Sequence, residues 1–454
     1  MTAETEHNLP AAWRALAALS LGFFMSLLDQ TTVAVALPTI AAEFDVGYAT
    51  AAWVSSAYLL AVVVPLVVSG RLGDRFGHRR LFLGGIAVFT AGAVASASAS
   101  GITLLIVCRF IQGLGAAALM PQTMAVINQV FPRSRRGAAY GAWGVVGSLA
   151  ALTGPVLAGI LVASGGWRAI FWLHLPLGIA ALILGALWIP RGIRHKTPID
   201  ALSVFYSLLG LTAVVTAVQE GLDSPALILL GVVGLAAVVA FLLRQRRPGA
   251  LIPLRLFSVR NFSVGVGTIV VMGVVASSTL IPLMAWLQDV RGLGADAAGW
   301  FAAPMAVVGF VMGPICGILS DRVPPKTMHL IGFTILGIAL TSMAVGMYID
   351  APLWFIVLTV TGLGFGQSFI WAANAAAVLG DIPGPDMGAA SGVYNTSRQL
   401  GGVVGVAITG AVLATAGAAP ALFVLAGVVF AGLIAAGWFR SPGMPGREAA
   451  NALE

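Results

Sequence analysis

Long apolar runs separated by short polar segments extend along the whole chain. Each run has about 20 residues and lacks the strict alternation of a membrane β-strand, so each predicts an α-helix that can cross a hydrocarbon layer of about 30 Å. Most connections between runs are short and leave no room for a soluble domain. The fourteen predicted spans are residues 14–37, 50–69, 80–99, 102–124, 137–163, 168–189, 201–219, 225–243, 264–287, 298–319, 328–348, 352–378, 388–414 and 419–438.

Charged residues are too rare for a soluble protein. They make up 9% of the chain, and 59% of the residues are hydrophobic, whereas a soluble domain has about 25% charged residues. The 56 glycines suit helices that pack closely through small residues in lipid. We therefore predict an all-α polytopic membrane protein embedded in the lipid bilayer. The net charge of +7 does not indicate a nucleic-acid partner.

Basic residues concentrate in alternate loops, which orients the predicted helices by the positive-inside rule. The other loops hold only Arg168 and Arg291, beside several acids. Both termini are therefore expected in the cytoplasm, and the first run is too long for a cleaved signal peptide. The basic set comprises Arg71, Arg75, Arg79, Arg80, Arg133, Arg135, Arg136, Arg191, Arg194, Lys196, Arg244, Arg246, Arg247, Arg255, Arg260, Arg322 and Lys326, with Arg14, Arg440 and Arg447 near the ends.

Three short motifs recur in the same order at nearly the same offset, which indicates an internal duplication. Two parallel halves around a central site is a known transporter plan. The chain is predicted to be two pseudo-symmetric six-helix bundles in the same orientation, with the seventh and eighth spans inserted between them. The motif pairs are 70–75 and 317–322, 113–115 and 362–364, and 137–141 and 388–392, at offsets of 247, 249 and 251.

The domain limits follow from this duplication. They are a cytoplasmic tail at 1–13, the first bundle at 14–189, the two inserted helices at 190–243, an amphipathic cytoplasmic linker at 244–263, the second bundle at 264–438 and a second tail at 439–454.

Asp29 is a carboxylate inside the first span, where an ionised group costs several kcal/mol and usually has a function. Arg109 lies inside the fourth span at a depth that matches Asp29 to within about 2 Å. An adjacent arginine lowers the pKa of a carboxyl and burial raises it, so such a pair can take up and release a proton. The equivalent residue in the second half is Leu358. A purely structural role remains the alternative for both charges.

The loop at 70–80 is short, glycine-rich and charged. Gly70 and Gly77 permit a tight turn and a close approach to a neighbouring helix. Asp74 can cap a helix or pair with an arginine of the loop, which makes the loop a candidate gate. Simple anchoring by the positive-inside rule is the alternative. The predicted gate also includes Arg75 and Arg79 of this loop. In the second copy of the motif, at 317–322, it includes Asp321 and Arg322.

The fifth span carries a stripe of small residues at spacing four, with Gly154 beside Pro155. Proline removes a backbone hydrogen bond and bends a helix, and small residues allow close packing. The span is therefore predicted to rock against a partner as part of the gate.

Several of these motifs resemble the successive signatures of the major facilitator superfamily, and specifically its fourteen-span drug/proton antiporter branch. The resemblance covers nearly the whole chain. It implies two halves that rock by alternating access, proton antiport and export of drugs or antibiotics. The matching segments are 28–38 (LDQTTVAVALP), 70–80 (GRLGDRFGHRR), 109–113 (RFIQG), 147–159 with its Gly-Pro, 251–257 (LIPLRLF) and 395–402 (NTSRQLGG).

The chain departs from the branch at three positions. Ala34 stands where asparagine is usual, and Ala158 where glycine is usual. His174 in the sixth span replaces a common asparagine, lies at a depth similar to Asp29 and could titrate as a third proton-coupling residue. In the resembled fold, however, the sixth span lies outside the cavity.

Arg398 lies near the middle of the thirteenth span, and no acid of the second half is at that depth. It could cap carbonyls, bind an anionic substrate group or share Asp29. Neutral or anionic compounds therefore fit at least as well as the lipophilic cations that the resemblance suggests. Aromatic and amide groups would hold bulky molecules loosely. Besides Arg398, the predicted cavity residues are Gln30, Tyr58, Gln112, Gln122, Trp143, Trp286, Gln367, Asn374, Tyr394 and Asn395.

The predicted function is a proton-coupled exporter of amphipathic small molecules in a bacterial cytoplasmic membrane, with Asp29 and Arg109 as the coupling pair. Alternatives are a dedicated exporter of one endogenous antibiotic, siderophore or lipid, or a non-transporting sensor. Neither lysine forms a phosphate-binding loop, so no ATP drive is expected. The five histidines lack metal-ligand spacing. We expect no enzymatic activity, no metal, no cofactor besides the coupling proton, and a monomer.

Overall fold

The computed structural model describes residues 9–46, 48–192, 200–219, 224–247, 250, 252–293, 298, 300–380 and 382–440, and these contain helices and no strand. Of the predicted tails at 1–13 and 439–454, residues 1–8 and 441–454 lie outside this part of the chain. So do Arg194, Lys196 and Arg447 of the orientation argument.

The first bundle contains α1 (Leu9–Glu43), α2 (Tyr48–Val63), α3 (Leu66–Phe76), α4 (His78–Ala97), α5 (Ile102–Val130), α6 (Arg136–Gly165), α7 (Arg168–Trp172) and α8 (His174–Trp188). The inserted pair is α9 (Ala201–Gln219) and α10 (Pro225–Arg244). The second bundle contains α11 (Arg260–Ser278), α12 (Leu280–Ala285), α14 (Ala303–Ser320), α15 (Pro325–Tyr348), α16 (Leu353–Leu379), α17 (Met387–Ala416) and α18 (Ala418–Ala436). Short 3₁₀ turns occur at Arg133–Arg135, Leu254–Ser258 and Gly384–Asp386, and a π-helical turn at Trp286–Val290.

All fourteen apolar runs are helical over most of their described residues. In the described part of the chain, ten helices are long and apolar enough to cross a membrane, or eleven when a bent pair is taken as one span. That pair is α2 and α3, which meet at 47°. Pro65 lies between them and has no N–H to continue the helical ladder. The all-helical membrane fold is as predicted, and the number fourteen stays a prediction.

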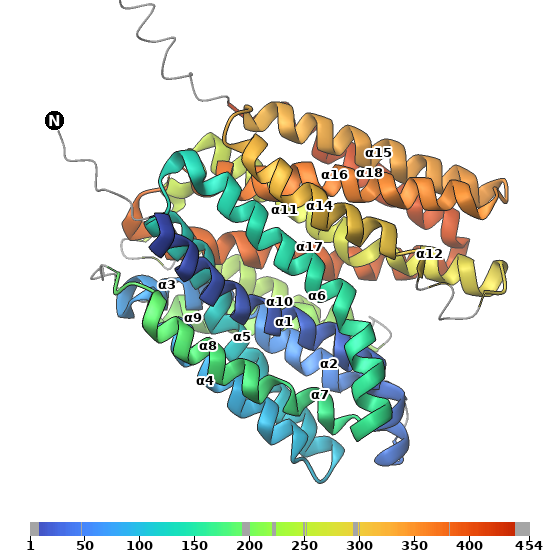
Figure 1. Ribbon diagram of the computed structural model, residues 1–454, viewed down its shortest axis with the longest axis horizontal. Helices are drawn as coiled ribbons and strands as arrows, with labels where there is room; N and C mark the ends of the chain where they lie inside the picture. The colour runs from blue at the N-terminus through green and yellow to red at the C-terminus, as the bar shows by residue number, and fades with distance from the viewer. Residues whose placement is uncertain are drawn as a thin grey trace, which may run out of the picture.

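The two bundles converge at one end of the molecule and diverge toward the other, as Figure 1 shows. They meet where α3 packs against α17 and where α6 packs against α14. We call the convergent end the basic end, because the basic segments 71–80, 133–136 and 322–326 lie there. The two contacts are related by the internal duplication, since each joins one copy of the repeat to the other.

The inserted helices pack mainly on each other. A Cβ at Gly210 would lie 2.8 Å from Val238 Cγ2, so the absence of a side chain lets α9 and α10 approach closely. On its other side α9 contacts both bundles, because Leu211 packs with Leu60 of α2 and Leu400 of α17. α10 presents apolar side chains outward, as expected for a helix that faces lipid.

The linker at 244–263 lies against the basic end. Arg255 forms an ion pair with Asp386, with Nη2 2.7 Å from Oδ2. Arg71 donates to the carbonyl of Ala250 over 3.3 Å. The linker therefore contacts both α3 and the turn that precedes α17.

At the opposite end the described acids outnumber the two arginines. Arg168 pairs with Glu43 at 2.5 Å, and Arg291 pairs with Asp350 at 2.6 Å. The hydrogen bond from Arg168 holds the pKa of the Glu43 carboxyl below its usual value. Both arginines that the orientation argument found in the acidic loops are thus paired with acids, which sharpens the charge difference between the ends.

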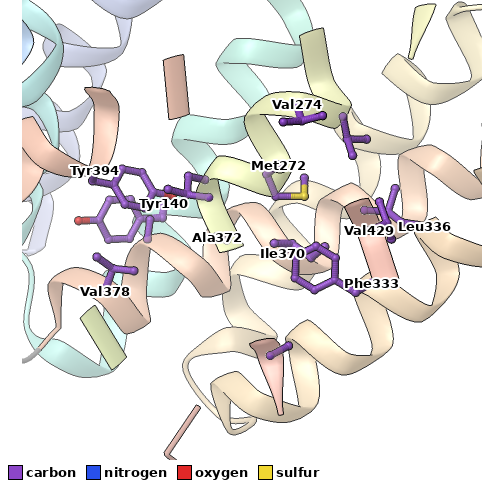
Figure 2. Close-up of a cluster of buried hydrophobic side chains, with 14 of the residues drawn as sticks. Tyr140, Met272, Val274, Phe333, Leu336, Ile370, Ala372, Val378, Tyr394 and Val429 are labelled. Atoms are coloured by element: carbon purple, nitrogen blue, oxygen red, sulfur yellow. The ribbon is translucent and has the colours of Figure 1, made fainter. Parts of the chain in front are cut away.

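The second bundle has a continuous apolar core. Figure 2 shows Met272, Phe333, Leu336, Ile370 and Val429, which come from α11, α15, α16 and α18. At the edge of this cluster lie Tyr140 of the first bundle and Tyr394 of the second.

Glycines set the distance between α11 and α17. A Cβ at Gly273 would lie 2.0 Å from the carbonyl oxygen of Arg398, and one at Gly401 would lie 2.2 Å from that of Val270. Because both obstacles are backbone atoms, neither can move aside without separating the helices. This close contact fixes how far α17 stands from α11, and thereby which face of α17 points away from it.

We predict that Gly273→Ala destabilises the protein by about 1–3 kcal/mol, the usual cost of overpacking. The matched control is Gly267→Ala on the same helix, where a Cβ meets no atom within 4 Å. The control should be neutral or gain up to about 1 kcal/mol from helix propensity. Thermal unfolding in detergent measures both. An equal effect of the two substitutions would contradict the close contact.

Candidate functional site

Asp29 and Arg109 form a buried ion pair in the first bundle. Asp29 lies in α1 and Arg109 in α5, and both side chains are fully buried. Nη1 of Arg109 lies 2.9 Å from Oδ1 and 2.8 Å from Oδ2 of Asp29. The contact predicted from matching depths is therefore present. Its role in proton coupling stays a prediction.

Further groups hold this pair in place. Gln112 donates from Nε2 to Oδ1 of Asp29 over 2.9 Å and accepts from Arg109 Nη1 over 2.6 Å. Arg109 also donates from Nε to the carbonyl of Val54 over 3.0 Å. Its guanidinium lies 4.3 Å from the ring centre of Tyr58. A buried charge pair is stable only when such extra contacts replace water, and here they come from α1, α2 and α5.

His174 completes the cluster from α8. Its Nε2 lies 4.0 Å from Oδ1 of Asp29 and has no partner at hydrogen-bond distance and angle among the described residues. Its Nδ1 lies 3.0 Å from the carbonyl oxygen of Ile170, and because a carbonyl oxygen can only accept, Nδ1 carries a proton. Nε2 is the ring nitrogen on the Asp29 side. The sixth span, expected outside the cavity, places its histidine at the charge pair.

A separate cavity of about 270 Å³ lies between the two bundles. From the first bundle it is lined by α1, α5 and α6, and from the second by α14, α16 and α17. Aromatic side chains supply much of the wall, and the charged one among the lining residues is Arg398. The lining residues are Phe23, Leu27, Met124, Tyr140, Gly141, Trp143, Gly144, Gly147, Ser148, Met305, Ala306, Gly309, Gly313, Gly364, Gln367, Ser368, Trp371, Ala372, Tyr394 and Arg398.

The ion pair and the cavity lie on different sides of α1. Leu27 lines the cavity, whereas Asp29, two residues later, is fully buried inside the first bundle. Two residues correspond to about 200° around a helix. α1 is therefore the element that the two sites share.

Four of the eleven predicted cavity residues line the cavity: Trp143, Gln367, Tyr394 and Arg398. Arg398 does not form an ion pair with Asp29, whose carboxylate pairs with Arg109.

The other seven predicted cavity residues lie elsewhere, because depth in a span does not reveal which way a side chain points. Tyr58 and Gln112 belong to the Asp29 cluster. Gln122 contacts His78 and the carbonyl of Ser69 at the basic end. The remaining four make local or interhelical contacts: Gln30 with the Ser26 carbonyl, Trp286 with the Arg291 guanidinium, Asn374 with Thr268, and Asn395 with Ser391 and Met124.

Sequence reasoning missed several wall residues, including Phe23, Tyr140 and Trp371. A signal for two of them was available. Trp371 follows the predicted residue Gln367 by four residues, and Tyr140 precedes the predicted residue Trp143 by three, so each pair shares a helix face. The small-residue stripe of the fifth span marked part of the cavity wall as well as a packing surface.

At the basic end, Asp74 of α3 binds the start of α17. Its Oδ1 accepts from the Gly388 amide over 2.8 Å, and its Oδ2 accepts from the Ala389 amide over 3.2 Å. The N-cap residue of α17, Asp386, makes no side-chain cap of its own. A carboxylate at a helix N-terminus satisfies free amides and interacts favourably with the helix dipole. We call this contact the first clasp.

Asp321, just after α14, binds the start of α6 in the same way. It accepts from the amides of Gly137 and Ala138 over 2.7 and 3.0 Å. The N-cap residue of α6, Arg135, also makes no side-chain cap. Burial raises the pKa of the Asp321 carboxyl, and the two amide hydrogen bonds act against this shift. This second clasp mirrors the first.

The predicted gate residues on α3, on α4 and just after α14 lie at the basic end with the clasps, whereas Gly154 and Pro155 lie more than four turns along α6 from the second clasp. A Cβ at Gly70 would lie 2.0 Å from the carbonyl oxygen of Gly388, so only glycine allows this approach of α3 to α17. Gly77 has a φ of 98°, which favours glycine at the turn between α3 and α4. Arg79 donates to the carbonyl of Ala186, whereas Arg75 and Arg322 are exposed. Gly154 faces Thr31 of α1, and Pro155 lies inside α6, which is one helix throughout.

A family model described as the Major Facilitator Superfamily matches residues 19–405 and again 266–453. The chain belongs to this superfamily. It is similar to an uncharacterized MFS-type transporter of Mycobacterium tuberculosis, with 40% identity over 400 residues that cover 87% of this chain and 69% of the relative.

It is also similar to the tetracenomycin C resistance and export protein of Streptomyces glaucescens, with 31% identity over 418 residues, 89% of this chain and 76% of the relative. The solved structure of the proton:xylose symporter XylE superposes with a TM-score of 0.72 at 15% identity and covers 94% of this chain and 95% of that one. The protein is thus a multi-pass membrane transporter of the major facilitator superfamily.

We predict that Asp74→Ala speeds hydrogen exchange at the amides of Gly388 and Ala389, while Asp321→Ala speeds it at Gly137 and Ala138. Loss of a helix cap costs about 0.5–2 kcal/mol, which corresponds to a two- to thirtyfold faster exchange. Mass-spectrometric hydrogen exchange on peptides that start α6 and α17 measures this. Each variant is the control for the other. Unchanged exchange at the facing helix would contradict the clasp.

Proposed function

We propose that this transporter is a proton-coupled exporter of amphipathic small molecules that works by alternating access. The observation that carries the proposal is the Asp29–Arg109 ion pair with His174 beside it, sealed from water in the core of one bundle. A cavity between the bundles supplies a separate place for the substrate.

The proton chemistry follows from the burial of the pair. Protonation of Asp29 would remove its charge and leave Arg109 charged and buried, and such a broken pair costs about 3–5 kcal/mol. Gln112 and the carbonyl of Val54 would be the remaining hydrogen-bond partners of Arg109. The unpaired buried charge of Arg109 favours a rearrangement of α1 relative to α5. Proton uptake and release at Asp29 would thereby drive a change of conformation.

His174 would extend this site. A proton placed between Asp29 and the Nε2 atom of His174 would let the two groups share a hydrogen bond, after they close from their 4.0 Å separation. His174 would then be a second proton-coupling residue.

The clasps would serve as the gate. In this conformation the bundles are joined at the basic end by Asp74 and Asp321. Release of both clasps would open the cavity toward that end, which is the cytoplasmic side if the charge asymmetry orients the protein as predicted.

The aromatic wall of the cavity favours bulky, partly apolar substrates. The relative from Streptomyces glaucescens is named as a tetracenomycin C resistance and export protein. That likeness supports either a multidrug exporter or a dedicated exporter of one endogenous compound. We place the protein in a bacterial cytoplasmic membrane, acting as a monomer without a cofactor other than the coupling proton.

We predict that Asp29→Asn abolishes substrate flux driven by a pH gradient in proteoliposomes, because an amide cannot bind or release the proton. Exchange of labelled for unlabelled substrate without a gradient should persist, because the cavity is intact. Ser164→Ala, at an exposed position near the end of α6 and outside both the ion pair and the cavity lining, is the control variant. Gradient-driven flux by the Asp29→Asn variant at the wild-type rate would refute the proposal.

We predict that His174→Asn keeps gradient-driven flux but alters its dependence on pH, because one of the two proton-binding groups is lost. The rate of flux is measured across about one and a half pH units on either side of neutrality, a range that contains the usual pKa of histidine. A pH profile that coincides with that of the wild type would exclude His174 from proton coupling.

A further inference from the structure

Arg398 is a cation in the wall of the cavity. Among the described residues, those that line the cavity include no aspartate or glutamate. Within the described part of the chain, the ion pairs of the transporter involve other arginines and histidines. A charge inside a membrane usually pairs with another group or contacts a substrate. The unpaired state of Arg398 therefore requires a reason.

The acids of the charge cluster and of the clasps already have partners. Asp29 pairs with Arg109 inside the first bundle. Asp74 and Asp321 accept hydrogen bonds from backbone amides at the basic end. Arg398 cannot use these acids in this conformation.

The packing of α17 presents Arg398 to the cavity. The backbone of α17 is held against α11 through the contacts of Gly273 with Arg398 O and of Gly401 with Val270 O. Tyr394, one turn before Arg398, lines the cavity as well. The cationic face of α17 is thus fixed by backbone contacts that do not depend on a ligand.

Other polar groups in the wall offer hydrogen-bond donors. The indole Nε1 of Trp143 is buried and has no acceptor among the described residues. Within the described part of the chain, the amide nitrogen of Gln367 contacts a weak acceptor, the sulfur of Met305, at 3.6 Å. Trp143 is held by stacking on Phe23, with ring centres 4.2 Å apart. These donors and Arg398 suit a ligand that carries acceptor oxygens.

We propose that the cavity selects aromatic amphipathic compounds that carry an acidic group, and that Arg398 binds this anion. The guanidinium presents a planar fork that can bind a carboxylate or sulfonate through two hydrogen bonds. The ring system of the ligand packs among Trp143, Trp371 and Tyr394. This inference rests on the proposed function, because it names the substrate class of the same cavity. Organic cations are disfavoured by the like charge of Arg398.

The test compares two probes that share one ring skeleton. Anilinonaphthalene sulfonate carries an anionic group, and phenylnaphthylamine is its uncharged parent. Binding of each probe to the purified full-length protein is measured by isothermal titration calorimetry. Titrations of each probe into detergent without protein are the blanks. Loss of a charge-assisted contact corresponds to about a tenfold to hundredfold weaker binding. Arg398→Gln should weaken sulfonate binding by this factor and change binding of the neutral probe less than about twofold.

Two further variants make the result specific. Arg398→Lys retains the charge without the planar fork, so it should retain part of the preference for the sulfonate. Arg80→Gln removes one exposed positive charge from the first turn of α4, outside the cavity, and should change neither probe. Sulfonate binding that is insensitive to Arg398→Gln, or an equal loss for both probes, would overturn the proposal.

Transport in proteoliposomes separates this inference from the proposed function. The fluxes of anilinonaphthalene sulfonate and of the cation ethidium are compared under one imposed pH gradient. Flux of ethidium alone would overturn the inference and leave proton-coupled export intact. Selective, Arg398-dependent binding of the sulfonate without any gradient-driven flux would support the inference and refute the proposed coupling.

Discussion

The structure depends on one constraint: a charge inside a hydrocarbon layer must be satisfied by other protein groups, because water is absent there. Asp29 meets this constraint through Arg109 and Gln112, and Arg109 in turn uses the carbonyl of Val54 and the ring of Tyr58. These contacts require α1, α2 and α5 to come together at one depth. His174 adds α8 to the same cluster. The costly charges therefore specify how the helices of the first bundle are arranged.

A related constraint, that the free amides at the start of a helix need an acceptor, explains the contact between the bundles. Helices α6 and α17 begin without a side-chain cap of their own, and each receives one from the other bundle through Asp321 or Asp74. Glycines at the contacts allow the backbones to approach until the carboxylates reach the amides. The duplication thus produces two related clasps at one end, while the bundles diverge at the other (Figure 1). A contact made of a few hydrogen bonds can be released without unfolding either bundle.

The buried charge cluster and the cavity are separate sites linked by α1. Phe23 and Leu27 of α1 line the cavity, and Asp29 faces the interior of the first bundle. Phe23 also stacks on Trp143 of α6, the helix that carries the second clasp at its start. Three features of the transporter, the ion pair, the cavity wall and one clasp, therefore meet on two adjacent helices. In the cavity itself Arg398 has no carboxylate partner within the described part of the chain, and an anionic ligand would supply one.

The sequence by itself determined the helical membrane fold and the duplication, and it made a pair of Asp29 with Arg109 possible, because apolar length, repeated motifs and depth along a helix are all linear properties of the chain. It also marked Asp74 and Asp321 as equivalent residues. Only the tertiary structure decided that each aspartate caps a helix of the other bundle, that His174 joins Asp29, and that Tyr58, Gln112 and Asn374 lie outside the cavity. Those facts depend on the rotation of each helix about its axis and on which helices become neighbours. Both are set by long-range packing, such as the glycine contacts between α11 and α17, and depth along a span does not encode them.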